Sequence, residues 1–99
     1  HELAVAQEQM LLLGRKTARE KIASFLLALS QRAEARGQPG NPVLVAMSRT
    51  DIGDFLGLTT ETVSRTFTQL RTSGTIALHN GGKAEIANRA RLEEIAQGG

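Results

Sequence analysis

The stretch Asp51-Ile52-Gly53-Asp54-Phe55-Leu56-Gly57-Leu58, followed by Thr59-Thr60-Glu61-Thr62-Val63-Ser64-Arg65, decides the fold of this 99-residue chain. Two short helices joined by a turn that contains glycine form a helix-turn-helix, and its second helix is shaped to enter the major groove of DNA. We expect Gly53 where the two helices cross closely, and Gly57 in the turn, where a left-handed backbone costs glycine little. The second helix should be capped by Thr59 or Thr60 and should run to about Thr72.

The second helix presents two different faces. Glu61, Ser64 and Arg65 are spaced i, i+3 and i+4 and therefore share one stripe of the helix. Val63, Phe67 and Leu70 form another stripe, which can face a core. An apolar back combined with a front of directional hydrogen-bonding groups is expected of a helix that reads bases.

The chemistry of the front stripe suits base edges. Arg65 can donate two hydrogen bonds to O6 and N7 of a guanine, and Glu61 can accept one from the N4 amine of a cytosine. Ser64 can form a hydrogen bond or touch a thymine methyl group. The spacing of Glu61 and Arg65 also favours an ordinary surface ion pair, so spacing alone leaves both interpretations open.

The flanking sequence completes a winged domain. Arg15-Lys16-Thr17 leads into a helix predicted to run to about Arg36, and a strand is predicted over 43–47 after the proline- and glycine-rich loop 37–42. Residues 76–79 and 83–87 flank Asn80-Gly81-Gly82 and predict a hairpin, which is a wing when it follows a reading helix. Asn88 can cap a last short helix. The fold class is α+β, mostly helical: a winged helix-turn-helix with a short β-hairpin wing, preceded by the tail of a dimerisation helix.

The first 14 residues form a separate unit in this interpretation, and residues 15–99 form the winged domain. Leu3, Ala6, Met10 and Leu13 have the 3-4-3 spacing of a coiled-coil seam, although only for two heptads. The seam can pack on a partner helix or on its own domain. The cations Arg15, Lys16, Arg19 and Lys21 that follow are more simply interpreted as a solvated face than as a nucleic-acid patch.

Composition excludes several classes of function. A net charge of +2 with a pI near 9.7 permits phosphate binding, while three Phe without Trp or Tyr disfavour single-strand binding by base stacking. Without cysteine there is no disulfide or thiolate metal site, and no run is long and apolar enough to span a bilayer. We find no nucleophile–base set, phosphate cradle or metal cluster, so neither an enzyme nor a cofactor is expected in this segment.

The whole chain resembles the C-terminal DNA-binding domain of the Crp/Fnr transcription regulators. The motifs that carry the resemblance are residues 11–18 with Glu20-Lys21 and Phe25-Leu26, Asp51-Ile52-Gly53 with Gly57-Leu58-Thr59, and Glu61-Thr62-Val63-Ser64-Arg65. Ser64 indicates the Fnr/FixK branch, because the cyclic-AMP receptor branch has Gly there. Thr66 departs from the pattern, since many helix-turn-helix sequences carry an aliphatic core residue at this position.

The resemblance implies a bacterial, cytoplasmic regulator, an activator of the Fnr/FixK type concerned with oxygen- or redox-related control. It implies a homodimer on double-stranded DNA, with TTGAT half-sites arranged as an inverted repeat, contact with RNA polymerase, and an N-terminal sensor domain outside this segment. The runner-up is a winged-helix module that binds protein instead of DNA, which would tolerate an acidic or hydrophobic second helix.

Phosphate contacts are expected from side chains at helix starts and on the wing: Arg49, Thr50, Thr59, Thr62, His79 and Lys83. Each also has a plainer interpretation. The three threonines can be helix caps, and Lys83 can simply make the hairpin soluble.

Overall fold

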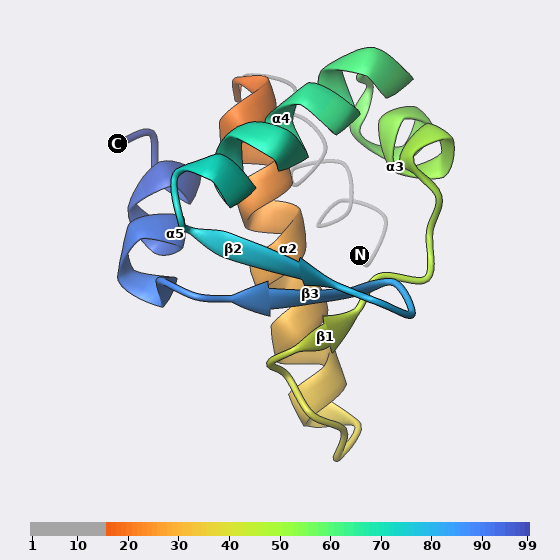
Figure 1. The fold of residues 1–99 in the computed structure, drawn as a ribbon, viewed down its shortest axis with the longest axis vertical. Coiled ribbons are helices and arrows are strands. Elements are labelled where there is room, and N and C mark those ends of the chain that lie inside the picture. The colour runs from red at the N-terminus through yellow and green to blue at the C-terminus, as the bar shows by residue number, and fades with distance from the viewer. Residues whose placement is uncertain (1–15) are drawn as a thin grey trace, which may run out of the picture.

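The computed structural model describes residues 16–99, so the predicted seam residues Leu3, Ala6, Met10 and Leu13 lie outside the described part. The elements in chain order are α2 (Ala18–Ala35), β1 (Val43–Leu44), α3 (Arg49–Leu56), α4 (Thr60–Thr72), β2 (Ile76–His79), β3 (Lys83–Ile86) and α5 (Arg89–Ala96). Figure 1 shows α2 running behind the sheet, with α3 and α4 at one end. The predicted winged helix-turn-helix is confirmed.

Helix α2 begins at a capping box. The hydroxyl of Thr17 accepts a hydrogen bond from the Glu20 amide at 3.2 Å, and the Glu20 carboxylate accepts one from the Thr17 amide at 3.2 Å. This reciprocal pair satisfies two amides that have no partner inside the helix, and it places the start of the helix at Ala18, directly after the predicted lead-in of Arg15-Lys16-Thr17. The backbone hydrogen bond from Thr17 holds the pKa of Glu20 below its ordinary value of 4.5.

Two lysines of the predicted solvated face instead bond helix C-termini. Lys21 Nζ donates to the Leu56 carbonyl at 3.0 Å, at the end of α3. Lys16 Nζ donates to the Ala96 carbonyl at 2.9 Å, at the end of α5, and to Ser24 Oγ at 3.1 Å. Because the last carbonyls of a helix lack internal partners, these ammonium groups stabilise both ends and tie them to α2.

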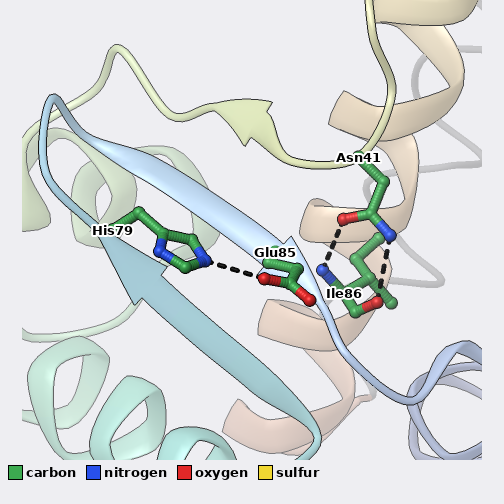
Figure 2. Close-up of polar contacts among 4 residues, drawn as sticks. All are labelled: Asn41, His79, Glu85 and Ile86. Atoms are coloured by element: carbon green, nitrogen blue, oxygen red, sulfur yellow. Dashed lines mark hydrogen bonds and ion pairs between the residues drawn. The ribbon is translucent and has the colours of Figure 1, made fainter.

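The sheet has three antiparallel strands in the order β1-β3-β2. Strand β1 is only two residues long, shorter than the predicted 43–47, and it pairs with β3 of the wing. Beside it, Asn41 Nδ2 donates to the Ile86 carbonyl at 3.0 Å, and Asn41 Oδ1 accepts from the Ile86 amide at 2.8 Å (Figure 2). The side chain of Asn41 therefore acts as one more rung of the ladder and holds the loop to the wing.

The helix-turn-helix has the geometry expected from its glycines. Gly57 adopts φ 73° and ends α3, as predicted for the turn. A Cβ on Gly53 would lie 2.5 Å from the Leu58 carbonyl oxygen, so only glycine permits this close approach. Both helices start at hydroxyl caps, Ser48 for α3 and Thr59 for α4.

One core joins all the helices to the inner face of the sheet. Its fully buried members include Ile22, Leu26, Ile52, Val63, Leu70 and Leu92. Thr66, the departure noted in the sequence, is also buried. Its hydroxyl donates to the Thr62 carbonyl at 2.7 Å, so the polar atom is satisfied inside the core.

Candidate nucleic-acid interface

The predicted reading stripe lies on the open side of α4. Glu61, Ser64 and Arg65 are all exposed, whereas Val63 and Phe67 on the opposite side are buried. The core thus holds the back of the helix and leaves the front free along its length. In Figure 1, α4 lies at the outer edge of the molecule beside α3.

Glu61 and Arg65 are not bonded to each other. Among residues 16–99 the ion pairs are His79–Glu85 and Arg91–Glu94, so the surface pair allowed by the spacing is not formed. The Glu61 carboxylate and the Arg65 guanidinium are both solvated and keep their hydrogen-bonding capacity. The geometry therefore favours the interpretation that leaves both groups available to a ligand.

Threonine hydroxyls link the starts of the two helices. Thr59 is the N-cap of α4: its hydroxyl accepts from the Thr62 amide at 3.1 Å and donates to the Thr62 hydroxyl at 2.9 Å. Thr60 donates to the Thr50 hydroxyl at 3.3 Å, which joins α4 to the first turn of α3. Capping is thus established for Thr59, while Thr50 and Thr59 stay exposed and can still accept an outside donor or bind an oxyanion.

Arg49, the first residue of α3, is stacked on the reading helix. Its guanidinium carbon lies 3.8 Å from the centroid of the Phe67 ring. The side chain is half-buried there, and this burial lowers the pKa of Arg49 from its ordinary value. Arginine nevertheless remains cationic at neutral pH, so Phe67 holds a positive charge at the edge of α4.

A hollow of about 270 Å³ lies between the wing, α3 and α4. Its apolar walls include Val45, Met47, Phe67 and Leu78, and Arg49, His79 and Lys83 also line it. The fold therefore gathers three of the six predicted phosphate contacts around one opening, although they come from α3, β2 and β3. Thr50, Thr59 and Thr62 are not among its lining residues.

Glu85 is a site residue that the sequence analysis missed. Its carboxylate lies 2.7 Å from His79 Nε2 across the wing (Figure 2). His79 faces Lys83 in the strand register, and Glu85 is its diagonal neighbour, on the same side of the hairpin. The sequence predicted the hairpin, but only its strand register shows that His79 and Glu85 are neighbours.

Other kinds of site find no support in the described part. Residues 16–99 bring together no group of three His, Cys, Asp or Glu side chains able to hold a metal ion. No helix in the same range is long and apolar enough to cross a membrane.

Known proteins are similar to this chain over nearly its whole length. Residues 20–95 match the family described as the Crp-like helix-turn-helix domain. The nitrogen fixation regulation protein FixK of Azorhizobium caulinodans is 50% identical over 95 residues, which are 95% of this chain and 38% of that protein. The transcriptional activator protein Anr of Pseudomonas aeruginosa is 44% identical over 97 residues, 98% of this chain and 39% of that protein.

The structure of FixK2 from Bradyrhizobium japonicum matches with a TM-score of 0.81 and 45% identity, covering 95% of this chain and 46% of that one. The chain thus spans about two fifths of the length of the curated relatives that it matches.

Proposed function

The chain belongs to the Crp-like helix-turn-helix family, and we propose from this premise that it is the DNA-binding part of a transcription activator of the Fnr/FixK type. The observation that carries the proposal is the exposed stripe of Glu61, Ser64 and Arg65, on a helix whose other face is buried in the core. Among residues 16–99 neither Glu61 nor Arg65 forms an ion pair. The relatives' names support it, because Anr is named a transcriptional activator protein and FixK a nitrogen fixation regulation protein.

Base reading follows from the donors and acceptors of that stripe. Arg65 donates to the O6 and N7 acceptors of a guanine, and Glu61 accepts from the amine of a cytosine one helical turn away. Ser64 is small and lets the helix approach the base edges closely. These contacts suit the G·C pair of a TTGAT half-site.

Backbone contacts orient the helix in the groove. Arg49 and Lys83 both line the hollow between the wing, α3 and α4 and would bind phosphates of the same strand segment. The hydroxyls of Thr50, Thr59 and Thr62 lie at helix starts, where amides and the helix dipole favour anions. His79 contributes a further donor from the wing when its ring is free of Glu85.

The remaining parts of the proposal concern the whole protein. We infer a homodimer held by the seam of Leu3, Ala6, Met10 and Leu13, because two reading helices related by a twofold axis match an inverted repeat. An N-terminal sensor domain, contact with RNA polymerase and action in the cytoplasm are inferred from the family alone. The greater length of the relatives supports the further domain among these.

The decisive experiment is a competition assay on a TTGAT palindrome with Arg65→Ala. Loss of the bidentate guanine contact should cost about 1–3 kcal/mol per half-site and relax preference at one G·C pair. Arg36→Ala is the matched control, because Arg36 is an exposed arginine at the far end of α2. If the unaltered chain binds no duplex even at low salt, a protein-binding winged helix becomes the better interpretation.

A further inference from the structure

The contact between His79 and Glu85 leaves one nitrogen of the histidine ring free. His79 ends β2 and Glu85 lies on β3, and the carboxylate is 2.7 Å from Nε2 of the ring. The second ring nitrogen, Nδ1, has no hydrogen-bond partner among residues 16–99, and in Figure 2 it lies on the side of the ring away from Glu85. The two side chains are 49% and 43% exposed, so a ligand can reach the ring.

The other charged groups near the ring are cations. Lys83 faces His79 across the wing, and Arg49 of α3 lines the same hollow. Of the residues that the structure describes, no acidic side chain lines this hollow. Since Arg49 and Lys83 are the cations that would bind DNA phosphates, a phosphate held by either one would come close to the ring of His79.

The chemistry of the pair decides where the ring carries its hydrogen. An ionised carboxylate has no proton to donate, so Nε2 must supply the hydrogen of the bond to Glu85. A neutral imidazole has one N–H group and one bare nitrogen. While the bond is kept, a neutral His79 therefore presents a lone pair at Nδ1, which repels a phosphate oxygen instead of binding it.

We propose that Glu85 positions His79 so that the ring binds a DNA phosphate only after it has taken up a proton. The imidazolium ion carries hydrogen on both nitrogens, so Nε2 keeps its bond to Glu85 while Nδ1 donates to the phosphate. The proton comes from the solvent, and no covalent bond other than the new N–H is made or broken. This inference rests on the proposed function, because the phosphate belongs to DNA.

Release of the ring from Glu85 is the other way to obtain a donor. It breaks a charge-assisted hydrogen bond and leaves the carboxylate near the phosphate with no cation between them. Protonation keeps the bond and places a positive ring between two anions, and both anions favour the charged form. Lys83 and Arg49 oppose that charge, but the phosphates that they bind offset their own. The geometry therefore favours proton uptake over release.

The test is the pH dependence of binding by the 99-residue chain to a duplex with one TTGAT half-site, at fixed low salt. Histidine is the side chain that ordinarily changes charge between about pH 5 and pH 8, so affinity is measured from about pH 8 to pH 6. We expect affinity to rise roughly three- to tenfold over this range, within the limit of about tenfold per pH unit for one proton. Calorimetry in two buffers of different ionisation enthalpy should show net proton uptake on binding.

Two variants separate the role of the ring from that of the carboxylate. His79→Gln should lose the rise in affinity at low pH, yet bind about as well as the unaltered chain near pH 8, where the neutral ring offers no donor. In Glu85→Gln the amide can donate to Nε2, which a carboxylate cannot do, so a neutral ring can carry its hydrogen on Nδ1 and bind the phosphate. The affinity of Glu85→Gln should therefore change little with pH, and its proton uptake should be smaller.

Two control variants cover the charge change and the second histidine. Glu93→Gln removes the same charge from α5 and should keep the full pH dependence, and so should His1→Gln, which replaces the other histidine of the chain. Equal pH dependence in the unaltered chain and in His79→Gln would overturn the proposal. Full pH dependence in Glu85→Gln would also overturn it, because the ring would then act without its partner.

Failure of this inference is distinct from failure of the proposed function. Duplex binding that does not change with pH refutes the proton uptake alone and leaves base reading by α4 untouched. Absence of duplex binding at every pH refutes both.

Discussion

The guanidinium of Arg49 lies 3.8 Å above the ring centroid of Phe67, so the first residue of α3 is held against the buried side of α4. Phe67 is itself 2% exposed and anchored in the core. The stacking restricts a long, flexible cation before any ligand arrives, and it places that cation at the rim of the hollow beneath the wing. Because Arg49 is fixed on Phe67, a phosphate bound by Arg49 would have a defined position relative to the reading helix α4.

Arg49→Lys tests this restriction because it keeps the charge and removes the planar group that stacks. Loss of a cation–π contact of ~0.5–1 kcal/mol should lower affinity about two- to fivefold, equally for the palindrome and for random duplex. Titration of both duplexes at one salt concentration measures this, with Arg36→Lys as control. A change in base preference at the G·C pair would contradict a backbone role for Arg49.

Lys83→Ala should remove one phosphate contact from the wing. Because each contact releases condensed counterions, the slope of log affinity against log salt should flatten by roughly one unit, with little change in sequence preference. Affinities measured at four or five salt concentrations determine the slope. An unchanged slope would leave Lys83 as a solubilising residue of the hairpin.

Glu61→Ala should have two opposite effects on DNA binding. Loss of the acceptor weakens discrimination at the G·C pair. Removal of a carboxylate from a surface that faces a polyanion should raise affinity for random duplex. The specificity ratio therefore falls, as it does for Arg65→Ala, but nonspecific affinity falls only for Arg65→Ala. Full discrimination by Glu61→Ala would show that Glu61 reads no base.

Glu20→Gln should reveal a stability contribution that depends on pH. The hydrogen bonds from Thr17 lower the folded-state pKa of Glu20 below 4.5. A carboxyl group with a depressed folded pKa stabilises the fold above its unfolded pKa, and that contribution is lost as pH falls through the folded value. The unaltered chain should thus have the higher Tm at pH 7, and the difference should close in the acid range below pH 4.5. Glu93→Gln is the control, because Glu93 is an exposed glutamate in a helix. A difference constant with pH would contradict the assignment.

Asn41→Ala should loosen the wing from the loop before β1. The variant leaves the amide and carbonyl of Ile86 without their side-chain partner, at a cost of about 1–3 kcal/mol in the free energy of unfolding. Urea unfolding measures the loss, and amide exchange at Ile86 should accelerate more than at Leu92 in the core. Unchanged protection of the Ile86 amide would show that water replaces Asn41 at little cost.

The sequence by itself determined the helix-turn-helix, because its signals are local. Gly53 and Gly57 specify a close crossing and a left-handed turn whatever surrounds them, and Thr59 caps α4 through an amide only three residues away. The exposed stripe of Glu61, Ser64 and Arg65 follows from helical periodicity once the helix is placed. Its role in base reading stays a prediction.

Only the tertiary structure decided the contacts between residues distant in sequence. The pairing of β1 with β3, the Asn41 clamp, the Lys21 bond to the end of α3 and the stacking of Arg49 on Phe67 all join different elements. No periodicity encodes such partners, because each depends on the packing angles of helices and on strand register, which arise when the whole core closes. Local periodicity was therefore enough to locate the reading face on α4. The hollow lined by Arg49, His79 and Lys83 depended on the closed fold, which brings the wing, α3 and α4 together.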